Sequence, residues 1–189
     1  MPIYTRRGDL GKTQVIGSVR RFKDDARIQA YGAVDEVGAV IGAALCFLGP
    51  DERLQDMQAI LTSIQQTLWD VGADLARVDD DQHPYRVTSE DVERLEHCID
   101  DMQKQCPPLD RFILRGGTPA AALLHWACTV VRRAERDVVH LQRMEAIHPT
   151  TLVYLNRLSD LLFVLARVVN ARNGQAEIEY ARSARVFHA

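Results

Sequence analysis

Over most of its length the chain repeats apolar residues at alternating spacings of three and four, which is the period of an amphipathic helix. The first series consists of Val34, Val37, Ile41, Ala44 and Leu48. Gly49 and Pro50 follow it and predict the end of that helix. The second series runs without a break from Leu54 to Val78 and indicates the apolar seam of a helical bundle.

Three further helices are predicted by their start signals. Thr88 to Asp91 (TSED) resembles a capping box with aspartate in place of glutamate. Thr118 and Pro119 supply an N-cap and a first-turn proline. The fifth helix is expected to begin near Pro149 and to end at Arg172 to Gln175 (RNGQ). The inward-facing residues are Val92, Leu95, Ile99 and Met102, then Leu124, Cys128, Val131 and Val138, then Leu155, Leu158, Leu162, Leu165 and Val169.

Together these series predict one all-α domain over residues 1–189, built as a ferritin-like up-down bundle of five helices. The bundle is expected over residues 24–175. A non-helical basic arm (residues 1–23) precedes it, and a polar, partly loose tail (residues 176–189) follows it. Asp79 to Tyr85 is predicted to be a polar loop between the second and third helices.

The composition suits a helical protein inside a cell. Of the 189 residues 47% are hydrophobic, and the net charge of −3 favours neither nucleic acid nor an anionic membrane as a partner. No apolar run approaches the roughly 20 residues of a membrane helix, and no signal peptide is recognisable at the start. We expect a reduced, soluble, cytoplasmic protein whose cysteines are small core residues: Cys46, Cys98, Cys106 and Cys128.

The start of the chain concentrates positive charge, with seven basic and three acidic side chains in the first 27 residues. Arg6 to Thr13 (RRGDLGKT) resembles a phosphate-binding P-loop, but Arg6 stands where the first glycine is required. A P-loop joins a buried strand to a helix, and neither pattern flanks this stretch, so we reject that fold. Its composition predicts either a folded anion-binding loop or a disordered basic tail. The candidate donors and turn residues are Thr5, Arg6, Gly8, Gly11, Lys12, Thr13, Gln14, Gly17 and Lys23.

The fourth predicted helix breaks its own apolar pattern. Glu135 falls on the apolar seam, where an unpaired carboxylate is costly, and Arg132, Arg133 and Arg136 lie within three residues of it. Two interpretations remain open: a solvated charged face with an internal ion pair, or an anion site that faces a cleft or a neighbouring subunit. Two further polar residues directly follow seam residues, namely Asp35 and Asn156.

Five stretches, in order along nearly the whole chain, resemble one family, the PduO-type cobalamin adenosyltransferases. They are YTRRGDLGKTQ (Tyr4–Gln14), KDDARIQAYGAVDE (Lys23–Glu36), FILRGGTPAAALLH (Phe112–His125), TVVRRAERDVV (Thr129–Val139) and YLNRLSDLLFVLARVVN (Tyr154–Asn170). The resemblance implies an enzyme that transfers the 5'-deoxyadenosyl group of ATP to the cobalt of cob(I)alamin and releases triphosphate. It also implies a homotrimer with active sites between subunits, Mg²⁺ as cofactor, and a reductase and an acceptor mutase as partners.

The resemblance also assigns site residues by motif. The implied ATP site comprises Thr5, Arg6, Arg7, Gly8, Thr13, Gln14 and Lys23 from the arm, Arg132, Arg133, Glu135 and Arg136 from the fourth helix, and Asn156 from the fifth. On the cobalamin side, Phe112 matches the aromatic residue that closes the lower face of the corrin ring, and Asp35 matches an acid that shapes the site. Lys23 and Arg132 would face the departing triphosphate, so these four are the catalytic candidates. Glu135 would orient the arginines or hold a hydrated Mg²⁺.

Three positions depart from the family pattern. Cys128 stands where an arginine is usual, and that arginine would pair with the acid matching Asp35 across a subunit interface. Arg115 stands where proline is usual, and Val37 to Val40 (VGAV) lacks a polar pair. These departures concern the contact between subunits and the cobalamin side of the site.

Two alternatives belong to other classes. A ferritin-like dimetal protein needs Glu-x-x-His on two helices, and the one such spacing found, Glu145 to His148, is followed directly by Pro149. A non-catalytic helical nucleotide-binding or scaffold protein would not need glycines in a basic arm. Binding of MgATP separates a scaffold from a transferase, because a bound ligand raises thermal stability.

Overall fold

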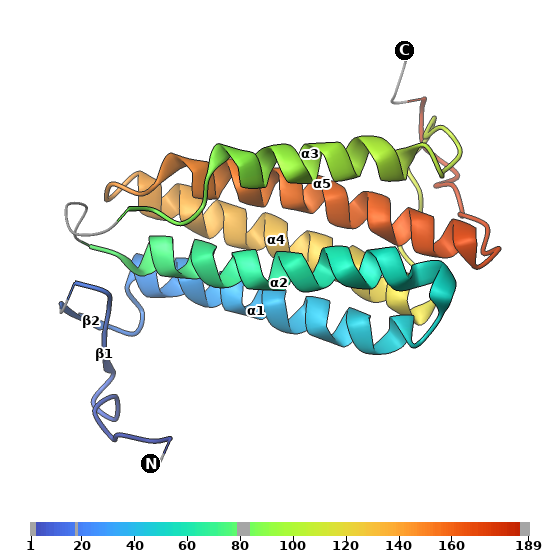
Figure 1. The fold of residues 1–189 in the computed structure, drawn as a ribbon. Coiled ribbons are helices and arrows are strands. Elements are labelled where there is room, and N and C mark those ends of the chain that lie inside the picture. The colour runs from blue at the N-terminus through green and yellow to red at the C-terminus, as the bar shows by residue number, and fades with distance from the viewer. Residues whose placement is uncertain (1–2, 18, 79–83, 186–189) are drawn as a thin grey trace.

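The computed structural model describes residues 3–17, 19–78 and 84–185. Its helices are α1 (Ala26–Leu48), α2 (Gln55–Ala76), α3 (Ser89–Gln103), α4 (Pro119–Gln142) and α5 (Pro149–Arg172), with a short 3-10 turn, η1 (Glu52–Leu54), before α2. Consecutive helices run antiparallel (Figure 1). The predicted five-helix up-down bundle with a non-helical arm is therefore confirmed.

The predicted helix starts lie where the capping residues are. At α3, the Asp91 carboxylate accepts the backbone N–H of Thr88 at 2.8 Å, which forms the predicted capping box. At α4, the Thr118 hydroxyl accepts the N–H of Ala121 at 3.2 Å, and Pro119 is the first helical residue. Most of the predicted loop before α3, residues 79–83, lies outside the described residues.

Helix α4 lies at the centre of the bundle, packed against α1 on one side and α5 on the other. Helix α2 covers α1, and α3 covers α5. The first apolar series is buried throughout, and so are the leucines at Leu155, Leu158, Leu162 and Leu165 in α5. Burial of these side chains provides the main driving force for folding.

Among the described helices, α1 alone is long and apolar enough to cross a membrane, with a mean hydropathy of 1.5 in its most apolar 18 residues. The expectation that no apolar run reaches this length is therefore wrong for α1. The helix carries Asp35 and Glu36 near its middle and packs in the bundle against α4 and α2.

The arm contains a short antiparallel hairpin that the sequence pattern did not predict. Strand β1 (Lys12–Gln14) pairs with β2 (Arg20–Phe22), with Thr13 opposite Arg21. The hairpin is joined to the bundle by backbone hydrogen bonds between Ile16 and the end of α2: Ile16 N–H donates to Ala76 at 3.1 Å, and Val78 N–H donates to Ile16 at 3.2 Å. The arm is thus a folded segment held at one end of the bundle (Figure 1).

The two ends of the bundle carry different segments (Figure 1). The arm lies at the end where α1 begins, α2 ends and α4 turns into α5. The opposite end carries the connection from α3 to α4 and the C-terminal residues that follow α5. Residues from the arm and from the α3–α4 connection are therefore separated by the length of the bundle.

Two expectations about individual residues need correction. Glu135 does not lie on the buried seam: Ala134 is fully buried there, and Glu135 is half-buried beside it. All four cysteines are free, but Cys46 is exposed, so it is no core residue. The part of the tail that is described contacts the α3–α4 connection, because Tyr180 N–H donates to the Phe112 carbonyl at 2.7 Å. Residues 186–189 lie outside the described residues.

Candidate active site

A polar hollow of about 400 Å³ lies between α4 and α5. It is lined by Arg132, Glu135 and Arg136 from α4 and by Asn156, Ser159 and Asp160 from α5. The Asn156 side-chain amide donates to Glu135 at 3.0 Å, and the Arg132 Nε donates to Ser159 at 3.5 Å. Arg132 and Arg136 thus line an open hollow in which the described contacts leave much of their hydrogen-bonding capacity unused, an arrangement suited to a polyanion.

An apolar hollow of about 750 Å³ adjoins the polar one. Its walls include Pro107, Pro108, Leu109, Phe112, Phe163 and Val164. Phe112 is 56% exposed, so a large part of its ring has no protein contact. An exposed aromatic ring beside an apolar wall is suited to a large ligand with a flat, apolar face.

The two hollows share Arg132 and Asp160 in their walls. These side chains come from neighbouring helices, and their nearest charged atoms are 4.0 Å apart. A ligand in the polar hollow and a second ligand in the apolar hollow would therefore meet beside Arg132. Sequence reasoning did not single out Asp160, because one aspartate on an exposed helix face carries no signal until α4 and α5 are packed together.

The chain segment that carries Phe112 is fixed from two sides. On one side it pairs with the C-terminal residues: Leu114 N–H donates to the Ile178 carbonyl at 2.7 Å, and Phe112 N–H donates to the Ser183 hydroxyl at 3.1 Å. On the other side the buried Asn170 side chain donates to the Gly116 carbonyl at 2.9 Å. The Phe112 ring is therefore exposed while its backbone is held.

Gly117 allows this fixation. Its φ is +105°, and a Cβ at this position would lie 2.2 Å from the Asn170 amide oxygen. Only glycine fits both the backbone conformation and the close approach. The second glycine of the Gly116-Gly117 pair in the family motif is therefore required by the local backbone conformation and by the contact with Asn170.

The arm forms a compact loop rather than a disordered tail in the described residues. Arg6 has a φ of +59°, and Gly11 N–H donates to the Gly8 carbonyl at 3.1 Å. The Lys23 side chain lies against Gly8, since a Cβ there would be 3.1 Å from the Lys23 Nζ. Lys23 N–H also donates to the Gly11 carbonyl at 2.8 Å. The loop leads into strand β1 and not into a helix, which agrees with the rejection of a P-loop.

The predicted nucleotide residues therefore fall into two groups that lie apart in one chain. Arg132, Glu135, Arg136 and Asn156 line the polar hollow, whereas none of the predicted arm residues does: Thr5, Arg6, Arg7, Gly8, Thr13, Gln14 and Lys23. Arg133 also lies outside this hollow, because its guanidinium forms an ion pair with Glu36 of α1.

Asp35 is likewise separated from Phe112. It lines a groove of about 820 Å³ between α1 and α2, together with Gly38, Gly42 and Trp69. Trp69 is 75% exposed, so this groove offers an uncovered aromatic side chain. Cys128, at the position where the family pattern has arginine, is buried, and burial raises the pKa of its thiol. A neutral thiol at this position cannot form the ion pair with Asp35 that an arginine would form.

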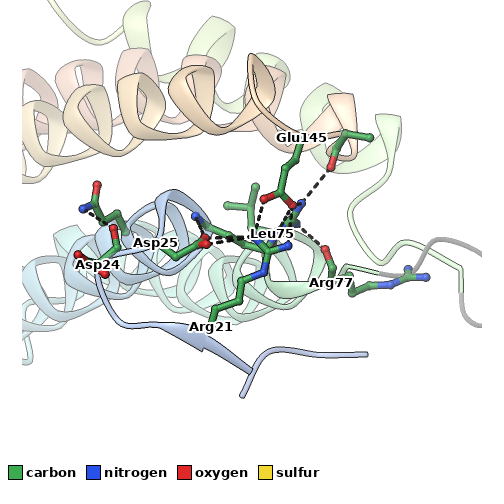
Figure 2. A network of polar contacts seen from close by, with 9 residues as sticks. Arg21, Asp24, Asp25, Leu75, Arg77 and Glu145 are labelled. Carbon is green, nitrogen blue, oxygen red and sulfur yellow. Dashed lines mark hydrogen bonds and ion pairs between the residues drawn. The ribbon is translucent and has the colours of Figure 1, made fainter. Parts of the chain in front are cut away.

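Glu145 and His148 have separate contacts. Glu145 pairs with Arg21 and Arg27 (Figure 2), while His148 stacks on Tyr85 and contacts the Val87 carbonyl at 2.7 Å. In the described part of the chain, no group of three or more His, Cys, Asp or Glu side chains is placed to hold a metal ion.

Comparisons with known proteins show which family the chain resembles. The family described as cobalamin adenosyltransferase matches residues 3–169. The chain is 48% identical over 187 residues to the corrinoid adenosyltransferase of Bacillus subtilis (strain 168), which covers 99% of this chain and 96% of that protein. It is 45% identical over 173 residues to the corrinoid adenosyltransferase of Mycobacterium tuberculosis (strain ATCC 25618 / H37Rv), covering 89% of this chain and 88% of that protein.

A solved structure gives the same result. A variant of the PduO-type ATP:corrinoid adenosyltransferase from Lactobacillus reuteri, complexed with cobalamin and ATP, superposes with a TM-score of 0.93 at 39% identity. The superposition covers 98% of this chain and 100% of the Lactobacillus reuteri chain. With the family match over residues 3–169, these likenesses show that the chain belongs to the cobalamin adenosyltransferase family.

Proposed function

We propose that the protein transfers the 5'-deoxyadenosyl group of ATP to the cobalt of cob(I)alamin, forming adenosylcobalamin and releasing triphosphate. The observation that carries this proposal is the pair of adjoining hollows, one polar with two arginines and one apolar with an exposed phenylalanine, which share Arg132. A triphosphate fits the first and a corrin ring fits the second. The C5' atom of the ribose and the cobalt would then meet at their boundary.

The chemistry requires positioning and charge more than proton transfer. Cob(I)alamin is itself a strong nucleophile, so no general base is needed. When the bond between C5' and the triphosphate oxygen breaks, negative charge grows on the leaving group. Arg132 and Arg136 in the polar hollow, with Lys23 and the N–H groups of the arm, would stabilise that charge.

Mg²⁺ would be bound mainly through the triphosphate. Mg²⁺ keeps several waters and is usually held by one or two carboxylates together with substrate phosphates. Glu135 and Asp160 both line the polar hollow and are of this ligand type. Either carboxylate could accept hydrogen bonds from metal-bound water, and Glu135 at the same time keeps Asn156 in place.

Phe112 would act on the cobalt by occupying the lower axial position. Its exposed ring and fixed backbone allow it to exclude water and other ligands from that side of the corrin. A Co(II) ion without a lower ligand is easier to reduce, so a hydrocarbon wedge favours formation of the Co(I) nucleophile. Asp35 would shape the same site from the other side.

The active site would be formed by two chains. The arm lies at one end of the bundle and does not line the polar hollow of its own chain, and Asp35 lies in a different groove from Phe112. Both pairs can meet if the arm and α1 of one subunit face α4 and α5 of the next. Head-to-tail contacts form a ring when the rotation between subunits closes, and a closed ring of three subunits, a homotrimer, is the assembly that we propose.

We further propose that the enzyme acts in the cytoplasm, where ATP is available and free cysteines, all four here, stay reduced. A reductase that supplies Co(I) and a mutase that accepts adenosylcobalamin are the partners that such a reaction requires. A non-catalytic nucleotide-binding scaffold is the remaining alternative, but it has no need of the apolar hollow beside Arg132.

The direct test is turnover. The protein is incubated with MgATP and chemically reduced cobalamin, and formation of the Co–C bond is followed by absorbance. A catalytic rate that depends on both substrates supports the proposal, whereas binding of MgATP without Co–C bond formation supports the scaffold.

A further inference from the structure

Two kinds of contact hold the arm on the bundle. The first is the pair of backbone hydrogen bonds that Ile16 makes with the end of α2. The second consists of the ion pairs of Arg21 of β2, one with Glu145 in the turn between α4 and α5 and one with Asp25, the N-cap of α1, at 3.1 Å (Figure 2). The backbone contact fixes one point of the arm, and the ion pairs fix the strand nearest to α1.

Glu145 is well placed to serve as an anchor. Arg27, which is 2% exposed, donates to Glu145 from Nη2 at 2.9 Å and to the carbonyls of Leu75 and Ala146 at 2.7 and 3.2 Å. The carboxylate is therefore held by a buried guanidinium that also joins the ends of three elements. Arg21 shares this Oε2 oxygen, to which its Nη2 donates at 2.9 Å, and its Nη1 donates to the other oxygen, Oε1.

The two arginines keep Glu145 ionised. The hydrogen bonds from Arg21, and after them those from Arg27, hold the pKa of the Glu145 carboxyl below its ordinary value, against the opposite effect of partial burial. A charged carboxylate with two guanidinium partners forms strong, directional hydrogen bonds. The anchor is thus rigid at neutral pH.

The position of Arg21 sets the position of the anion-binding loop. In the hairpin Arg21 stands opposite Thr13, and Lys23 lies two residues further along. Lys23 in turn bonds to Gly11 through its backbone and covers Gly8 with its side chain. Release of Arg21 from Glu145 would therefore loosen the strand that carries Lys23 and supports the loop, with Asp25 as the remaining ion-pair partner of Arg21.

We propose that Glu145 is a positioning residue for ATP: through Arg21 it holds the arm in the conformation that binds the triphosphate. This inference rests on the proposed function, and it assigns a role to a residue outside both hollows. Ordering a loop in advance lowers the entropic cost of binding. The arm of a chain without this anchor must be ordered by ATP itself, so the affinity for ATP falls while the affinity for the corrinoid does not change.

The test uses Glu145→Gln, Arg21→Gln and the double variant in the full-length protein. Glu145→Gln keeps the volume and one oxygen acceptor, and Arg21→Gln leaves the buried Arg27 untouched. Each single variant is expected to raise the Kd for MgATP, measured by calorimetry, and the KM for ATP by roughly tenfold. The double variant should be no worse than Arg21→Gln alone, because Arg21→Gln already removes the contact with Glu145. Arg21→Lys should restore part of the affinity.

Asp56→Asn is the matched control. Asp56 also accepts two hydrogen bonds from one arginine, Arg172, at 2.6 and 2.7 Å, but it lies where α2 begins, at the opposite end of the bundle from the arm. This variant should lower the melting temperature and leave the affinity for ATP unchanged. A second measurement is the rate at which trypsin cleaves after Arg6 and Arg7, which should rise in Glu145→Gln and not in Asp56→Asn.

Three results would overturn the inference. One is an unchanged Kd for MgATP in Glu145→Gln, with only a lower melting temperature. Another is an equal rise in the KM for ATP and for the corrinoid. The third is additive effects in the double variant. Because calorimetry measures ATP binding without turnover, failure of the wild-type protein to form the Co–C bond would contradict the proposed function and leave this inference testable.

Discussion

Arg132 and Asp160 face one another at the boundary of the polar and apolar hollows, with Nη2 and Oδ1 4.0 Å apart. Both side chains remain about half exposed, 44% for Arg132 and 53% for Asp160, so each keeps polar atoms available for a ligand. An arginine held loosely by a neighbouring carboxylate can turn its remaining N–H groups to a ligand. This position places Arg132, like Asp160, in the walls of both hollows.

Replacing Arg132 should abolish transfer without unfolding the bundle. Arg132→Ala removes a partly exposed side chain and no core contact, and the loss of one group that stabilises the leaving triphosphate lowers kcat by about 10²- to 10³-fold. Arg132→Lys keeps the charge but not the planar fork, and should recover only part of the rate. Turnover and melting temperature are measured side by side. Arg143→Ala, at the exposed end of the same helix, is the control that should retain full activity.

Phe112→Ala should affect reduction more than transfer. Without the ring, a lower ligand can reach Co(II) and make it harder to reduce, so turnover with a weak reductant should fall much further than turnover with preformed cob(I)alamin. The same comparison is made with Leu114→Ala, which removes another exposed apolar side chain two residues away. Equal losses with both forms of the corrinoid would contradict the assigned role.

Arg115 should contribute to the affinity for the corrinoid. It lines the apolar hollow, and among the described residues no hydrogen bond or ion pair engages its guanidinium. The edge of a corrin ring carries amide groups whose carbonyl oxygens can accept from it. Arg115→Gln should raise the KM for cob(I)alamin by roughly tenfold and leave the KM for ATP unchanged. Arg111→Gln, on the same segment but near Glu179, is the matched control.

His125 should make the stability of the fold depend on pH. It is buried beside Phe163, and burial, with the nearby Arg115, lowers its pKa from 6.5 to about 4. Between pH 6.5 and 4 this histidine is protonated in the unfolded chain but neutral in the folded one. The free energy of unfolding is therefore unaffected by His125 above pH 6.5 and falls as the pH drops from 6.5 towards 4. The expected loss between pH 7.5 and 5 is about 2 kcal/mol. Urea unfolding at several pH values measures it, and His125→Leu should flatten the dependence in that range.

The helices could be predicted from sequence because their signals are local. The capping residues Thr88 and Asp91 and the start signal Thr118-Pro119 act within one turn, and the apolar period reports the buried face directly. Glu135 was misplaced by one position because a strict heptad seam and a straight helix differ by a fraction of a turn. The hairpin was missed because its strands are three residues long and consist mainly of basic and polar residues.

The site could be predicted in its residue types but not in its assembly. Motifs indicated the arm and the arginine-rich helix, yet only the packing of α4 on α5 brings Asp160 beside Arg132. The contact between Arg21 and Glu145 joins residues 124 positions apart, so no local pattern reveals it. The separation of the arm from the polar hollow is equally a property of the folded chain.

The central claim is that the arm of one chain and the arginine-bearing helix of another bind the same triphosphate. Subunit complementation tests it most directly, with Lys23→Ala in the arm and Arg132→Ala in α4, each inactive alone. When equal amounts are refolded together, random assembly gives about a quarter of the sites an intact arm and an intact helix. We predict that the mixture regains about that fraction of wild-type Co–C bond formation. A mixture that stays as inactive as its components would contradict the claim.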